Sequence, residues 1–174
     1  MATRSYTSRR ELEEYSFSPV IAIAAPLLLL VLQAFVPKMF PRTLILDLPL
    51  IAVIFFAVSR RSPIAGAFTG AIIGLLQDAL TGQSLGVNGI AKTVIGYAAA
   101  SIGVQVDVEN LTTRVLMNFV FGLLQSGLLY LIARFLEGQK DIHLQPLHEL
   151  IRATINTAVA IPLFLLLDHF KQRD

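Results

Sequence analysis

Long apolar runs separated by short polar segments dominate the chain. No charged residue lies between Glu14 and Lys38, and comparable runs recur up to residue 167. A hydrocarbon core about 30 Å thick needs roughly 20 helical residues, so these runs predict transmembrane helices. The six predicted helices cover residues 19–36, about 40 or 44 to 58, 64–80, about 88–106, 115–136 and 147–167.

The second of these helices has an alternative interpretation. It is short and carries Asp47, so a re-entrant segment would leave five spans. We expect residues 19–170 to form one transmembrane bundle, with a cytoplasmic segment at residues 1–18 and a cytoplasmic tail at 171–174. In the first segment, Arg9 with Glu13 and Arg10 with Glu14 are spaced as ion pairs of a short helix.

The composition agrees with a membrane protein. Hydrophobic residues make up 55% and charged residues 15%, with a mean hydropathy of +0.67. An ordinary soluble domain carries about a quarter charged residues. The net charge is only +2, and basic residues flank apolar runs, which favours contact with the lipid bilayer over nucleic acid. The absence of cysteine excludes disulfides, thiolate metal sites and a nucleophilic cysteine.

Lysine and arginine are distributed unevenly between the two sides of the predicted bundle. Cytoplasmic ends are enriched in these residues, so the asymmetry favours both termini inside, with residues 81–87 outside. The inner side then holds eight, Arg4, Arg9, Arg10, Arg60, Arg61, Arg114, Lys171 and Arg173, and the outer side six, Lys38, Arg42, Lys92, Arg134, Lys140 and Arg152.

The third predicted helix has small residues along one face. Gly66, Gly70 and Gly74 are spaced four apart, which lets a neighbouring backbone approach closely. Asp78 is the next residue of this series, beside Gln77. A carboxylate at this depth is costly unless it is paired, hydrogen-bonded or hydrated. It therefore either caps the following turn or pairs with Lys92, as a structural group, or it serves function.

A tight connection follows this helix. Gly82 and Gly86 permit positive φ, and Ser84 or Asn88 could cap the fourth helix. Lys92 lies one turn into that helix and Gly96 continues its face. We therefore predict that Asp78 and Lys92 are neighbours across the turn.

Polar side chains form stripes on the last two predicted helices. Such stripes indicate interhelical hydrogen bonds, in preference to the lining of a small wet cavity. They consist of Asn118, Gly122, Gln125 and Ser126 on the fifth helix, and Arg152 and Asn156 on the sixth.

The chain offers little catalytic chemistry. His143 and His148, with Asp141 and Glu149, match no metal-binding spacing, and loop histidines are ordinarily solvated. No phosphate-binding glycine loop or Ser/His/Asp arrangement in motif context is present. The sequence therefore predicts neither an enzyme nor a resident cofactor.

Residues 49–96 resemble the bacterial MreD family of rod shape-determining proteins. The resemblance rests on a proline in an early helix, a glycine-rich helix ending in Gly-Leu-Leu-Gln-Asp, and a turn Gly-x-x-Leu-Gly-x-Asn before an alanine-rich helix. In this chain these are Pro49, residues 74–78 and residues 82–88, followed by Ala91 and Tyr97. The motif covers about a quarter of the chain, and it makes Gln77, Asp78, Gly82, Gly86 and Asn88 candidate partner contacts.

The resemblance implies a subunit of the cell-elongation machinery in the bacterial inner membrane. It would bind MreC and, indirectly, MreB filaments and the RodA/PBP2-type peptidoglycan synthase. The family's fold is similar to the substrate-binding S components of energy-coupling vitamin transporters. That likeness supplies the alternative, a small-molecule transporter subunit, which should show polar and aromatic ligand groups in its outer loops.

Overall fold

The computed structural model describes residues 16–40, 45–106, 108, 110–139, 141, 143 and 145–172. The ion pairs expected between Arg9 and Glu13 and between Arg10 and Glu14 lie outside these residues. The fold is all-helical apart from one short strand pair in the described part of the chain. The elements are β1 (Ser16–Phe17), α1 (Pro19–Met39), α2 (Leu48–Arg60), α3 (Pro63–Thr81), α4 (Val87–Gly103), α5 (Leu111–Phe135), α6 (Pro146–Asp168) and β2 (Lys171–Gln172).

Local signals set the beginnings of the helices. α2 begins at Leu48, later than predicted, because the Asp47 carboxylate accepts a hydrogen bond from the Leu50 amide and caps the helix. α5 begins at Leu111, earlier than predicted, because Asn110 caps it through the Thr112 amide at 2.9 Å. The predicted six helices are therefore present, with boundaries shifted by a few residues.

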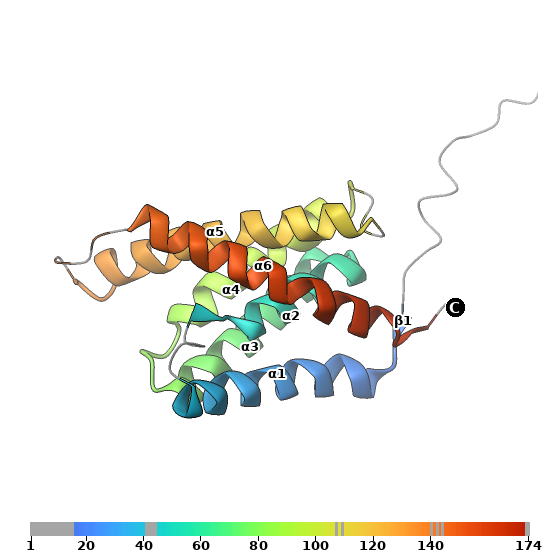
Figure 1. Ribbon diagram of the computed structural model, residues 1–174, viewed down its shortest axis with the longest axis horizontal. Helices are drawn as coiled ribbons and strands as arrows, with labels where there is room; N and C mark the ends of the chain where they lie inside the picture. The colour runs from blue at the N-terminus through green and yellow to red at the C-terminus, as the bar shows by residue number, and fades with distance from the viewer. Residues whose placement is uncertain are drawn as a thin grey trace, which may run out of the picture.

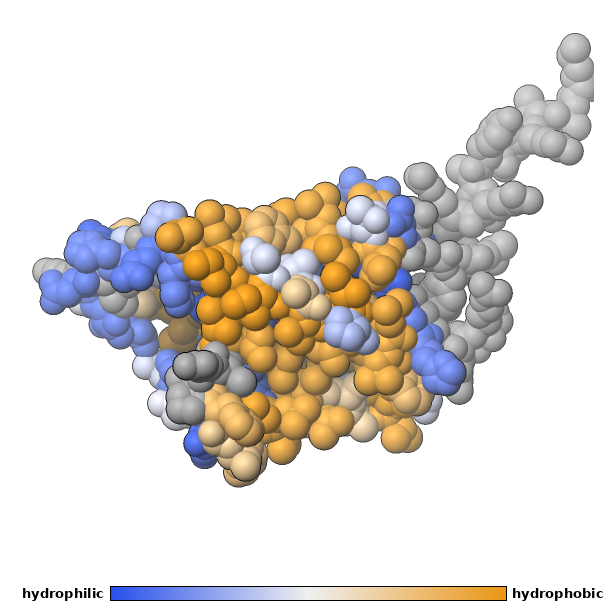
Figure 2. Space-filling view, in the orientation of Figure 1, coloured by the Kyte–Doolittle hydropathy of each residue, from blue (hydrophilic) through white to orange (hydrophobic). Residues whose placement is uncertain are grey.

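Among the described residues, four helices, α1, α3, α5 and α6, are long and apolar enough to cross a membrane. Figure 2 shows an apolar surface over the middle of the molecule, with hydrophilic residues at its ends. α2 has 13 residues and is about 20 Å long, which is shorter than the hydrocarbon core. Whether α2 and α4 also cross the whole bilayer stays a prediction.

α2 lies at the centre of the bundle (Figure 1). Every residue from Pro49 to Ser59 is buried, whereas a lipid-facing helix would expose one side. Phe55 stacks on Phe164 of α6 with ring centroids 5.6 Å apart. On another side, Ile54 and Val58 pack in one apolar cluster with Ile95 of α4. The uniform hydrophobicity of α2 thus reflects enclosure by other helices.

α3 and α4 are in backbone contact through glycine. A β-carbon on Gly66 would lie 3.0 Å from the carbonyl carbon of Gly96, and one on Gly74 would lie 2.6 Å from that of Asn88. The separation at Gly74 is shorter than real β-carbons show, and the β-carbon on Gly66 would lie closer still to the Gly96 oxygen, so neither position has room for a side chain. This contact fixes the relative position of the two helices and of the turn that joins them.

The strands β1 and β2 form one antiparallel pair, with Ser16 opposite Gln172 and Phe17 opposite Lys171. The described ends of the chain therefore meet at one end of the bundle, on the right in Figure 1. The α3–α4 turn and the α5–α6 connection lie at the opposite end, which we call the turn end.

Candidate functional site

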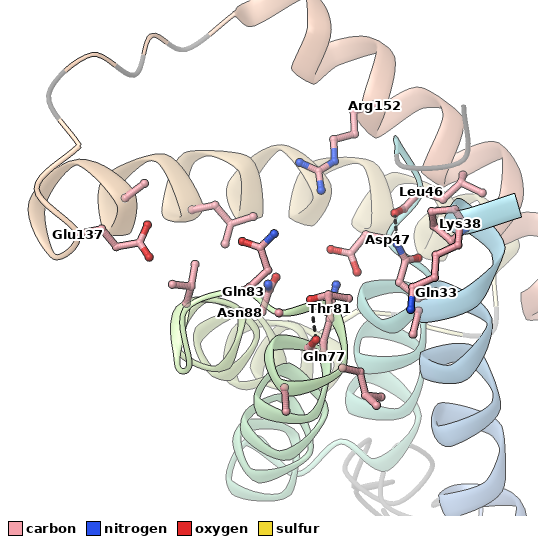
Figure 3. Close-up of a pocket in the computed structure, with 18 of the residues that line it drawn as sticks. Gln33, Lys38, Leu46, Asp47, Gln77, Thr81, Gln83, Asn88, Glu137 and Arg152 are labelled. Atoms are coloured by element: carbon pink, nitrogen blue, oxygen red, sulfur yellow. Dashed lines mark hydrogen bonds between the residues drawn. The ribbon is translucent and has the colours of Figure 1, made fainter. Parts of the chain in front are cut away.

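A cavity of about 810 Å³ opens at the turn end. Residues from α1, α3, α4, α5 and α6 line it, and several carry polar side chains that Figure 3 shows around it. Gln77 and Thr81 of α3 lie on one side, with Glu137 and Arg152 across from them. Polar groups lining a concave site make this the candidate functional site. The polar lining residues are Gln33, Lys38, Asp47, Gln77, Thr81, Gln83, Asn88, Glu137, Gln139 and Arg152.

A buried ion pair lies beneath this cavity. Lys92 Nζ is 2.9 Å from Asp47 Oδ2, and the lysine is 0% exposed. Lys92 also donates to Asn88 Oδ1 at 3.2 Å. α2 and α4 both begin at the turn end, so the residue before α2 and the second turn of α4 reach the same depth. Two charges at this depth are tolerated because each is paired and hydrogen-bonded.

Two amide side chains complete the surroundings of Asp47. Gln125 of α5 donates to Asp47 Oδ2, and Asn156 of α6 accepts from the Asp47 backbone amide at 2.7 Å. Asn156 also donates to the carbonyl of Ile45 at 3.0 Å. The polar residues on α5 and α6 therefore anchor the beginning of α2. The Asp47 carboxylate links α2 to α4 and α5, and the Asp47 backbone amide links α2 to α6.

Of the two structural roles expected for Asp78, the cap of the following turn is confirmed, whereas the expected ion pair with Lys92 is wrong because Lys92 pairs with Asp47. Asp78 is 0% exposed, and its carboxylate accepts from the backbone amides of Gly86, Asn88 and Gly89 and from the Asn88 side chain, at 2.8 to 3.3 Å. The amides of the first turn of α4 bind the carboxylate because the N-cap residue of α4, Gly86, has no side chain that could accept their hydrogen bonds. Asp78 thus caps α4 from α3, and neither Ser84 nor Asn88 does so.

Asn88 connects the two acidic groups. Its side chain donates to Asp78 and accepts from Lys92, so Asp78, Asn88, Lys92, Asp47 and Gln125 form one hydrogen-bonded chain. Gly82 and Gly86 adopt positive φ of 69° and 101° in the turn, where they have open space around them. The residues of the sequence motif therefore build a rigid, capped turn.

Arg152 and Gln77, which line the cavity, have hydrogen-bonding groups that lack a protein partner at hydrogen-bond distance in the described part of the chain. Arg152 has Glu149 as its nearest charged partner among the described residues, at 3.9 Å. Gln77 is 7% exposed, and its Oε1 atom accepts no hydrogen bond. Gln125 Oε1 is likewise unsatisfied, beside a small void that Arg152 and Asn156 also line. Unsatisfied buried acceptors are costly, so the Oε1 atoms of Gln77 and Gln125 each have the capacity to accept a hydrogen bond.

Sequence reasoning missed a second ion pair at the other end of the bundle. Arg114 of α5 is 2.7 Å from Asp168 of α6, and its guanidinium lies 5.8 Å from the centre of the Phe164 ring. Between the two polar ends, Asn118 donates to Thr157 at 3.3 Å. Arg114 precedes Asn118 by four residues, so the helical spacing of the α5 stripe could have identified it.

The histidines carry no site in the described part of the chain. His143 and His148 are exposed, and no group of three His, Cys, Asp or Glu is placed to hold a metal ion there. The cavity instead offers amides, a hydroxyl and charged groups, which suit hydrogen bonding to a polar molecule or to a partner.

Comparison with known proteins identifies the family. Searches among curated proteins and among solved structures return no match. A family model described as rod shape-determining protein MreD matches residues 15–171. The match extends far beyond the motif at residues 74–88 and includes every described helix. The chain therefore belongs to the MreD family of rod shape-determining proteins and is a multi-pass membrane protein.

Proposed function

We propose that this protein is a non-catalytic scaffold of the bacterial cell-elongation complex, which binds MreC and is linked through it to MreB and the RodA/PBP2-type synthase. Residues 19–170 form its bundle in the inner membrane, with both termini in the cytoplasm. Family membership supports the role in cell shape. The most conspicuous polar residues, Asp78 and Lys92, are occupied in holding helices together, as expected of a scaffold.

The observation that carries the partner proposal is the capped α3–α4 turn. Asp78 holds its backbone through three amides, so residues 82–86 are presented in a fixed conformation. Leu85 projects from this turn and is 76% exposed. An exposed leucine on a rigid polar turn is a suitable anchor for an extracytoplasmic partner, because little ordering entropy is lost on binding.

The proposed orientation places the turn end outside the cell. It rests on the excess of lysine and arginine on the other side of the bundle. The β1–β2 pair requires residues 16–17 and 171–172 to lie on the same side, which supports a common location for the two termini.

The partner proposal is tested by Leu85→Glu, with Leu147→Glu as the matched control. Leu147 is also at the turn end and is 72% exposed, so the two substitutions cost the free protein similarly little. We expect Leu85→Glu to reduce co-purification of MreC about tenfold or more and to make rod-shaped cells round, whereas Leu147→Glu retains both. Equal retention of MreC by the two variants, at equal membrane abundance, would contradict the proposal.

The cavity is the observation that favours the alternative, a transporter S component. A cavity of about 810 Å³ could enclose a vitamin-sized molecule. None of the described residues that line it is aromatic, however, so these residues offer no ring on which a heteroaromatic ligand could stack. A saturable rise in melting temperature with a vitamin-like ligand, together with normal cell shape in a deletion strain, would replace the scaffold proposal by this one.

A further inference from the structure

We infer that the cavity at the turn end binds a phosphoglycerol group, with Arg152 contacting the phosphate and Gln77 accepting a hydrogen bond from a hydroxyl. The glycerol phosphate is either a soluble ester or the head group of a lipid. This ligand is additional to the scaffold function and does not depend on it.

The charges around the cavity favour an anion near Arg152. Lys92 neutralises Asp47 beneath the cavity, so neither charge remains to repel or attract a ligand strongly. Arg152 points toward the cavity in Figure 3, and Lys38 lies on the same side. Among the described lining residues, Glu137 is the other carboxylate, and it lies at the opposite end, where it accepts a hydrogen bond from Gln139. The electrostatic field of Arg152 and Lys38 therefore attracts an anion to their end of the cavity, away from Glu137.

Arg152 has the donors to hold a phosphate. A guanidinium carries five N–H groups in a planar fork, which fits two phosphate oxygens at once. The 3.9 Å separation from Glu149 is too long for a hydrogen bond, so the fork remains available. Its side chain is 27% exposed, which allows a ligand to reach it while much of the surrounding water is excluded.

Gln77 requires that the ligand also carry a hydrogen-bond donor. Its Oε1 atom is buried without a hydrogen-bond partner, although the residue lines the cavity. A phosphodiester carries no O–H group, and a phosphate monoester is mostly the dianion at neutral pH, so an esterified phosphate offers acceptors and does not satisfy this oxygen. A ligand that carries both a phosphate and a hydroxyl can satisfy Arg152 and Gln77 together, and glycerol phosphate is the smallest common group of this kind.

The position of the cavity is compatible with both sources of the group. It lies at the boundary of the apolar surface, where the phosphates of a bilayer are found. Leu80 of α3 and Leu129 of α5 also line it, so acyl chains could leave beside apolar side chains. It is equally a concave polar site that a soluble ester could enter from water.

The test measures binding of defined probes to the purified full-length protein. One arm titrates sn-glycerol 3-phosphate against the detergent-solubilised protein and follows thermal unfolding. The other compares retention of phosphatidylglycerol and phosphatidylcholine by native mass spectrometry, since the choline head group lacks hydroxyl donors. The variants are Arg152→Gln and Gln77→Leu, with Arg134→Gln as the matched control, because Arg134 is an exposed arginine of α5 that does not line the cavity.

We expect Arg152→Gln and Gln77→Leu each to weaken binding about tenfold or more, the loss of one charge-assisted or buried hydrogen bond, while Arg134→Gln stays within about twofold. Stabilisation by the soluble ester alone assigns a soluble ligand, and preference for phosphatidylglycerol alone assigns a lipid; both support the inference. Absence of binding in both arms, or equal affinity of Arg152→Gln and Arg134→Gln, overturns it. If Arg152→Gln does not fold, Gln77→Leu and Gln77→Glu decide the same question.

Discussion

Replacing Gly70 by alanine tests the close contact of α3 with α4 by adding a single methyl group. The β-carbon would lie 2.5 Å from the carbonyl carbon of Lys92 and closer still to its oxygen. Ordinary van der Waals contact begins at 3.4 Å, so the carbonyl carbon alone requires the helices to separate by about 0.9 Å, and the closer oxygen requires more. Overpacking of this kind costs about 1–3 kcal/mol, and here the obstacle is backbone, which cannot rotate away.

The same displacement should disturb the ion pair beneath the cavity, because the clashing carbonyl belongs to Lys92 itself. Gly127→Ala is the matched control, since Gly127 lies within a helix and has no atom within 4 Å of the added carbon. That change should be neutral or stabilise by up to about 1 kcal/mol through helix propensity.

The assay is the unfolding free energy of both variants in the same detergent, with membrane abundance as a second measure. We expect Gly70→Ala to be less stable than Gly127→Ala by about 2 kcal/mol or more. Equal stability of the two would refute the backbone contact between α3 and α4.

Three further predictions address the polar groups and the topology. Asp47→Ala or Lys92→Met alone should cost about 3–5 kcal/mol because one buried charge loses its partner, and the double variant should recover part of the loss in a double-mutant cycle of unfolding. Asp78→Ala should cost about 1–3 kcal/mol and raise amide hydrogen exchange at the start of α4, whose cap it removes; unchanged exchange would exclude the capping role. A cysteine at Ser84, in a chain without native cysteine, should react with an impermeant maleimide in intact spheroplasts, and labelling only after permeabilisation would reverse the proposed orientation.

The helices could be predicted from sequence because their driving force is local to each run. A bilayer requires about 20 apolar residues, and α1, α3, α5 and α6 satisfy this with clear polar boundaries. The location of α2 could not be predicted in the same way. Hydropathy does not distinguish a helix surrounded by lipid from one surrounded by other helices. Only the short length of α2 and the presence of Asp47 indicated that this helix differs from its neighbours.

The polar contacts were harder to predict, since they depend on which buried donors compete for each carboxylate. Asp78 and Lys92 are close in sequence and lie at similar depth in the membrane, which favoured the prediction that they form an ion pair. The first-turn amides of α4 have no other cap, and they occupy Asp78 instead. Lys92 then pairs with a residue 45 positions earlier in the chain, a partner that no spacing rule within one hairpin can identify.

The pairing of Asp47 with Lys92 has a consequence for biogenesis. α2 leaves the ribosome before α4, so its carboxylate cannot pair with Lys92 until 45 more residues have been made. At about 5–20 residues per second, this interval lasts roughly 2 to 9 s. A short helix headed by an unpaired carboxylate partitions poorly into lipid on its own. α2 should therefore stay beside the translocon until α4 has been made and enter the membrane together with α3 and α4, which makes these three helices one unit of insertion.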